Sequence, residues 1–186
     1  ENGYGWIKGQ RARAVPDLEQ YHKTHTFLSD ALTLEAGKEI EKAVAEKKPF
    51  YLNMAHYAVH SPFETDERFI SHYTDPNKSQ QARAFATLIE GMDKSLGDIL
   101  DKLEDMGIAE NTLIIFLGDN GGDAPLGDAA DYGSSAPFKG KKGSEYEGGV
   151  RVPFIVSWAH PNPNNKFQKA YPIARNAIQT QMGTSS

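Results

Sequence analysis

Apolar side chains recur at helical spacing in two parts of the chain. From Gln80 to Met106 they return every three or four residues, which predicts a long amphipathic helix capped by Gly107. An earlier helix is predicted to begin at an N-cap on Thr33 and to end near Lys48, before Pro49. The inward face of this helix is expected to carry Leu34, Ile40 and Val44.

Shorter apolar runs predict strands. They lie at residues 50–55, 112–117 and 152–158, and a short helical stretch is expected around Glu67 to Tyr73. Helices therefore alternate with strands, which indicates the α/β class, with a parallel or mixed sheet flanked by helices. The long polar loop 118–151 is too extended to be only a connector, so it is expected to be functional.

Composition narrows the function classes. With 186 residues, 39% of them hydrophobic, the chain can form one domain or part of one, and a net charge of −5 argues against nucleic-acid binding. Cysteine is absent, and no apolar run has membrane-spanning length. We expect an irregular lead-in over 1–30, a core over 31–158 and a truncated end over 159–186.

The segment Gly118–Gly122 directly follows the predicted strand 112–117. In open α/β sheets this is the edge at which ligands bind. The carboxylate of Asp119 and the amide oxygen of Asn120 are hard donors that suit Ca²⁺ or Mg²⁺. The alternative is that Asn120-Gly121 only forms a turn, because both residue types tolerate positive φ.

Two further loops carry residue types that a hydrolase of anionic esters would need. His60 follows the first predicted strand, and Lys142 lies in a lysine-rich, glycine-rich segment. A metal-assisted ester hydrolase needs oxygen ligands, a cation for the anionic group and an imidazole to protonate the departing oxygen. A loop histidine can instead be purely structural, and we assign that or a supporting role to His56.

The remaining charges near these loops have simpler interpretations. Lys139 and Lys141 are predicted to be solvated, and Arg151 can pair with a buried carboxylate. The acidic residues of the long loop are spaced unlike an EF-hand and are taken as polar loop residues: Asp123, Asp128 and Asp131.

Three separated segments, in their order and spacing, resemble the type I sulfatases of the alkaline phosphatase superfamily, in the arylsulfatase branch. They are residues 50–62, 111–121 and 140–153, and the resemblance covers roughly residues 30–158. It implies that the chain is part of an alkaline-phosphatase-like sheet flanked by helices. It also implies a Ca²⁺-dependent hydrolase of sulfate monoesters that uses a formylglycine nucleophile.

The resemblance also implies roles for individual residues. Asp119 and Asn120 match two Ca²⁺ ligands of the family, and Ca²⁺ is favoured over Mg²⁺. Lys142 matches the lysine that contacts the substrate sulfate, and His60 matches the histidine at the sulfate and leaving-group oxygen. Glu145 and Glu147 lie in a matched segment but have no metal role in the family.

The chain departs from the family in one region. The Cys/Ser-x-Pro-x-Arg segment that yields formylglycine is missing, as are the paired aspartate ligands of the family's first strand. We therefore expect a fragment whose complete enzyme supplies these groups. Because calcium affinity depends on ligand number and charge, the fragment alone is expected to bind Ca²⁺ weakly and to be inactive.

Other functions stay open at this point. One is a phosphonate or phosphodiester hydrolase of the same superfamily, and another is a noncatalytic module that binds anions or saccharides. For a sulfatase, a sulfated carbohydrate is the expected substrate and the periplasm or the extracellular space the expected location. Nothing in the sequence fixes the oligomeric state.

Overall fold

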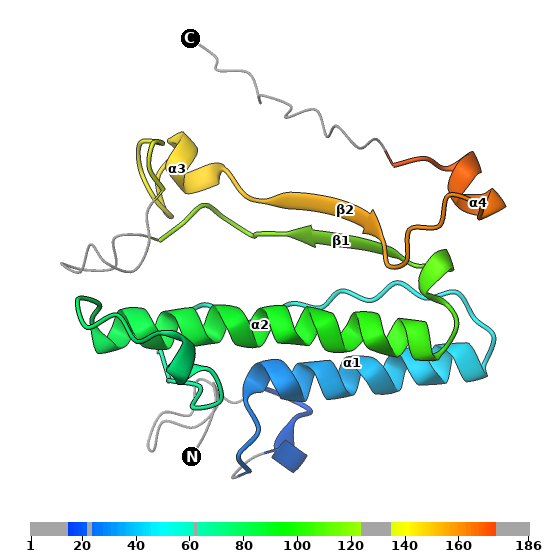
Figure 1. The fold of residues 1–186 in the computed structure, drawn as a ribbon, viewed down its shortest axis with the longest axis horizontal. Coiled ribbons are helices and arrows are strands. Elements are labelled where there is room, and N and C mark those ends of the chain that lie inside the picture. The colour runs from blue at the N-terminus through cyan, green and yellow to red at the C-terminus, as the bar shows by residue number, and fades with distance from the viewer. Residues whose placement is uncertain (1–14, 22–23, 62, 124–134, 174–186) are drawn as a thin grey trace.

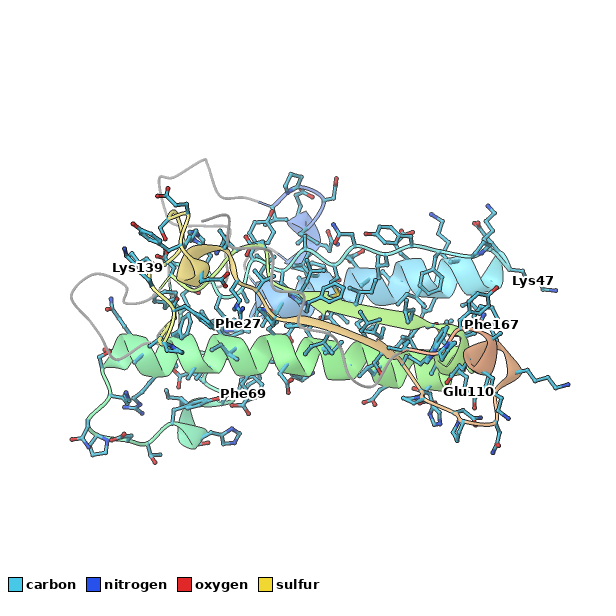
Figure 2. The ribbon with its side chains drawn as sticks, turned by 90° about the horizontal axis from the view of Figure 1, so that it is seen from above. Phe27, Lys47, Phe69, Glu110, Lys139 and Phe167 are labelled. Atoms are coloured by element: carbon cyan, nitrogen blue, oxygen red, sulfur yellow. The ribbon has the colours of Figure 1, made fainter. Side chains whose placement is uncertain are left out.

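A computed structural model describes four stretches of the chain: residues 15–21, 24–61, 63–123 and 135–173. Two long helices form one layer, α1 (Leu28–Ala45) and α2 (Gln80–Asp105). Two strands form the other, β1 (Leu113–Leu117) and β2 (Phe154–Trp158). Figure 1 shows the strand pair lying over the helix pair and running along it, and Figure 2 shows the same layers from above.

The smaller elements are single turns. Three are 3₁₀-helices, η2, η3 and η4, at Glu19–Tyr21, Ile70–His72 and Ala109–Asn111. The other two are short α-helices, α3 at Glu147–Val150 and α4 at Lys166–Ala170. The helical stretch predicted over residues 67–73 is thus reduced to η3. Helix α4 was not predicted, although Asn165 is a good N-cap whose side-chain oxygen accepts from the backbone N–H of Phe167 at 2.9 Å.

Helix α2 confirms the prediction from periodicity. Its N-cap is Ser79, whose Oγ accepts from the backbone N–H of Ala82 at 3.0 Å. The chain then leaves the helix through Gly107, which has a φ of +68° that favours glycine. Local sequence signals therefore fix both ends of this helix.

Helix α1 begins earlier than predicted, and Thr33 is not its N-cap. The N-cap is Phe27, and Thr33 lies within the helix, where its Oγ1 donates to the carbonyl oxygen of Ser29 at 2.7 Å. Thr33 is buried because it faces α2, whereas Leu34, predicted to face inward, is 52% exposed. Ile40 is buried as predicted, and Val44 packs against the same cluster.

The core lies where the two layers meet. Its buried members come from both helices and from η4, and partly buried residues of the sheet and loops pack around them. The buried set is Ala36, Ile40, Ile99, Leu103 and Ala109. Ile114 of β1 packs on this cluster, which fixes one face of the strand against the helices.

The two strands pair antiparallel, with Leu113 opposite Trp158 and Leu117 opposite Phe154. Exposure alternates along β1, as expected for a strand with one covered face. Leu113, Ile115 and Leu117 point away from the helices and are 44–56% exposed. No helix within the described stretches is both long and apolar enough to cross a membrane.

The predicted strand at residues 50–55 is wrong in one respect. The segment is extended but is not assigned as a strand, because no backbone ladder joins it to β1 or β2 in the described part of the chain. It runs back along α2 in the same direction as β1 (Figure 1), with Met54 packed on the core. Residues 50–55 are therefore parallel to β1 and antiparallel to β2, which agrees with a mixed α/β arrangement.

The core predicts a clear difference between two leucine truncations. Leu103 is 1% exposed, so Leu103→Ala leaves a cavity and should lower the free energy of unfolding by about 2–5 kcal/mol. Leu113→Ala removes the same atoms from a side chain that is 44% exposed and should cost much less. Urea unfolding of the two variants measures the difference, and equal losses would contradict this description of the core.

Candidate functional site

Strand β1 carries the predicted metal ligands to one end of the sheet. The backbone N–H of Gly118 donates to the carbonyl oxygen of Pro153 at 3.2 Å, which continues the strand contact one residue beyond Leu117. Asp119 is then exposed and Asn120 is half-buried. Asn120 donates through Nδ2 to the carbonyl oxygen of Gly121 at 2.8 Å, so its side-chain oxygen is the atom suited to a metal.

The backbone bends at residues 119–121 without the positive φ that the simple-turn alternative for Asn120-Gly121 invoked. Among the described residues, positive φ is confined to five positions, and neither Asn120 nor Gly121 is one of them. Those five are Asp17, Lys47, Gly107, Gly140 and Gly143. The glycine at 121 is needed for a different reason, which is its contact with the neighbouring loop.

Gly121 lies directly against the backbone of Gly148 and Gly149. Its N–H donates to the carbonyl oxygen of Gly149 at 2.8 Å. A Cβ placed on Gly121 would lie 2.3 Å from the carbonyl oxygen of Gly148, a distance that real Cβ atoms do not reach. Glycine here allows two backbones to approach each other closely, and a side chain would hold them apart.

The same contact positions Lys142. Its backbone N–H donates to the carbonyl oxygen of Gly122 at 2.9 Å, and Gly148 donates to the carbonyl oxygen of Lys139 at 2.8 Å. The loop that carries Lys142 is therefore tied to the loop that carries Asp119 and Asn120. The structure brings together the predicted sulfate-binding lysine and the predicted metal ligands as neighbouring segments.

His60 comes from a separate segment. The extended stretch after α1 runs along α2 toward the end of the molecule at which β1 ends (Figure 1). The ring of His60 is exposed, and its Nδ1 lies 2.9 Å from the carbonyl oxygen of Ser61. Because a carbonyl only accepts, Nδ1 carries the hydrogen in this contact, and Nε2 is the nitrogen that can exchange a proton with a substrate.

His56 lies in a small polar cluster between the helices. Its Nε2 is 3.4 Å from Oγ of Ser95, which in turn is 2.5 Å from Oγ1 of Thr33. Nδ1 of His56 is buried without a hydrogen-bond partner among the described residues. Burial lowers the pKa of His56, which favours the neutral ring. A supporting role agrees with this place, but Thr33 and Ser95 were not predicted as its partners because they are distant in sequence.

Two cationic side chains near Lys142 in the sequence form ion pairs with carboxylates. Lys141 Nζ lies 3.6 Å from Oδ1 of Asp123, and Nε of Arg151 donates to Oε2 of Glu147 at 2.8 Å. Arg151 does pair with a carboxylate, although Glu147 is half-exposed and not buried. Asp128 and Asp131 lie outside the described residues.

Asp119 and Asn120 suit a hard cation by their chemistry but do not complete a site. Ca²⁺ takes six to eight oxygen ligands, and these two residues offer one carboxylate and one amide oxygen. In the described stretches, no three His, Asp or Glu side chains gather closely enough to hold a metal. The two residues therefore fit one side of a calcium site, with the other ligands still to be supplied.

Comparison with known proteins identifies the family. The Sulfatase family profile matches residues 2–181, which is nearly the whole chain. The chain therefore belongs to the Sulfatase family, as the three matched segments predicted.

Individual relatives agree with this assignment. N-acetylgalactosamine-6-sulfatase of Canis lupus familiaris is 33% identical over 135 residues, which are 73% of this chain and 23% of that protein. Steryl-sulfatase of Homo sapiens is 30% identical over 145 residues, covering 76% of this chain and 23% of that protein. The chain spans about a quarter of the length of the relatives it matches.

A solved structure has the same local fold. The crystal structure of Ps i-CgsB in complex with k-i-k-neocarrahexaose superimposes with a TM-score of 0.65 and 32% sequence identity. The match covers 72% of this chain and 28% of that one. The helix and strand arrangement described above is therefore a piece of the sulfatase fold.

The glycine contact predicts a strong effect of one methyl group. Gly121→Ala should push residues 118–122 away from Gly148 and lower the free energy of unfolding by about 1–3 kcal/mol. The amide hydrogens of Gly121 and Lys142 should then exchange faster with solvent. Gly97→Ala is the matched control, because a Cβ at Gly97 has no heavy atom within 4 Å. Unchanged exchange in Gly121→Ala would contradict the close contact.

The buried ring of His56 predicts a pH dependence of stability. Its pKa is lowered in the folded chain from 6.5, so the unfolded chain binds the proton more readily. The stability that the neutral His56 ring contributes should therefore be fully present above about pH 6.5. This contribution to the free energy of unfolding should fall as the pH drops toward the pKa of the folded chain. In His56→Gln this loss should be smaller, and in His160→Gln, at an exposed position, it should persist. Chemical unfolding at pH 7.5 and 5.5 measures both, and an unaltered loss in His56→Gln would contradict the assignment.

Proposed function

We propose that this chain forms the sulfate-binding side, and one side of the metal site, of a calcium-dependent sulfatase that hydrolyses sulfate monoesters. The observation that carries the proposal is the backbone contact that ties the Asp119–Asn120 loop to the Lys142 loop. It ties the segment that carries the hard oxygen ligands to the segment that carries a cationic side chain, the two kinds of group that an anionic ester requires. Membership of the Sulfatase family supports the type of reaction.

Lys142 is proposed to bind the sulfate group. Its side chain is half-buried, and it makes no ion pair with any carboxylate in the described stretches. A lysine that keeps its charge can stabilise the negative charge on the nonbridging oxygens as the ester bond breaks. Its backbone hydrogen bond to Gly122 holds the backbone of Lys142 near the end of β1.

His60 is proposed to protonate the departing oxygen. The contact with the carbonyl of Ser61 holds the hydrogen on Nδ1, so the proton for the leaving group is delivered from Nε2 of the imidazolium. The exposed position of the ring leaves room for an ester to approach it.

Asp119 and Asn120 would hold Ca²⁺ through their side-chain oxygens, together with ligands from outside this chain. When bound, the ion would polarise the sulfate group as a Lewis acid. The formylglycine nucleophile is likewise proposed to lie outside these 186 residues. The chain by itself is therefore proposed to bind Ca²⁺ weakly and to lack activity.

The proposed substrate is a sulfated carbohydrate. One relative is named N-acetylgalactosamine-6-sulfatase, and the similar solved structure holds k-i-k-neocarrahexaose. Both names refer to carbohydrates. A periplasmic or extracellular enzyme would meet polymeric substrates of this kind, and that location is part of the proposal.

The proposal predicts two separate losses of activity in the complete enzyme that contains this chain. Lys142→Ala should lower kcat/KM for sulfate release by about 10²–10³-fold, because one charge-stabilising group is lost. His60→Ala should lower it by about 10²–10⁴-fold, with a smaller loss for esters whose leaving group needs no proton. Lys141→Ala is the matched control, because Lys141 is already paired with Asp123.

The measurement is inorganic sulfate released from a panel of sulfated oligosaccharides in the presence of Ca²⁺. Full activity in Lys142→Ala, or an equal loss in Lys141→Ala, would contradict the assigned roles. Faster hydrolysis of phosphate diesters or phosphonates than of any sulfate ester would favour the phosphoryl alternative. Tight oligosaccharide binding without any turnover would favour a noncatalytic module.

A further inference from the structure

Residues 139–151, the loop around Lys142, carry four cationic side chains, which have two different kinds of environment. They are Lys139, Lys141, Lys142 and Arg151. Lys141 and Arg151 face Asp123 and Glu147, respectively, at ion-pair distance. In the described part of the chain, Lys139 and Lys142 make no ion pair with a carboxylate. The uncompensated positive charge of this loop is therefore concentrated on these two lysines.

Lys139 is held in place by an aromatic ring. Its Nζ lies 3.9 Å from the centroid of the Tyr146 ring, which is 43% exposed. A cation over a ring face is attracted by the π electrons, but its full charge remains available to an anion. Figure 2 shows Lys139 beside α3, at the end of the molecule away from α4.

The backbone around this pair is closely packed, unlike that of a free surface lysine. The carbonyl oxygen of Lys139 accepts from Gly148 at 2.8 Å. Gly140 has a φ of +83°, and a Cβ on it would lie 2.8 Å from Cβ of Tyr146. The glycine thus lets Tyr146 approach the residue next to Lys139 and fixes the position of the ring under the ammonium group.

Lys139 and Lys142 lie on the same tied loop and close in sequence. Three residues span at most about 10–11 Å, so both ammonium groups can reach the same small oligosaccharide. With an anion at Lys142, Lys139 would be within reach of a neighbouring part of the ligand. Carbohydrates with several sulfate groups present anions at such separations.

We propose that Lys139, held by Tyr146, forms a second anion subsite that binds another sulfate group of the same carbohydrate. This inference rests on the proposed function, because it takes the sulfate at Lys142 as the reacting one. The subsite would make the enzyme prefer substrates with two or more sulfates over those with one. It also assigns a role to Lys139 other than that of a solvated charge.

The test compares two probes that differ by one charge, neocarrabiose with one sulfate and neocarrabiose with two. Stopped-flow fluorescence measures the Kd of each for the complete protein with Ca²⁺ before the bound probe is hydrolysed. The wild type should bind the doubly sulfated probe about tenfold more tightly than the singly sulfated one, as expected for one charge-assisted contact. Lys139→Gln should lose this preference, and Lys139→Arg should keep it.

Lys141→Gln is the matched control, since it removes the same charge two residues away from a side chain that is already paired. It should keep the preference. The inference is overturned if the wild type does not prefer the doubly sulfated probe, if Lys139→Gln keeps the preference, or if Lys141→Gln loses it equally. Failure of the proposed function would differ from these results: the preference would be present, and no sulfate would be released from any ester.

Discussion

The site depends on a contact between two backbones that only glycine permits. Gly121 approaches Gly148 so closely that a Cβ would be 2.3 Å from a carbonyl oxygen. The hydrogen bonds across this contact connect the end of β1 to the loop that carries Lys142. Without it, the oxygen ligands and the cationic side chain would belong to two independent loops. The chemistry proposed for this chain therefore rests on the absence of side chains at these positions.

The helix pair provides the rigid support for that contact. Ile40 of α1, Leu103 of α2 and Ile114 of β1 belong to one packed cluster, so the direction of β1 is fixed by the core. The Thr33–Ser95–His56 cluster adds a polar connection from the two helices to the segment that leads to His60. Exposed loops thus carry the proposed functional groups, and each loop begins or ends at an element that the core holds.

The sequence predicts those features whose cause is local. Helix α2 was predicted from its apolar spacing and from the glycine at 107, and the structure adds Ser79 as its N-cap, a cause that is equally local. β1 and β2 follow from short apolar runs. The metal-ligand and lysine assignments could be made because separated segments matched one family in order and spacing. Membership of that family is confirmed, whereas the role of each residue stays a prediction.

Features with distant causes could not be predicted in the same way. Thr33 is a common N-cap type, but a buried hydroxyl on Ser95, 62 positions away, makes it an interior residue of α1. Residues 50–55 have strand-like composition, yet a strand also requires a neighbour with which to form a ladder. The glycines at 121 and 148 are typical of turns. Only their proximity in space shows that they allow two backbones to approach closely. A glycine pair in each of two matched loops is therefore a signal for close backbone contact as much as for a turn.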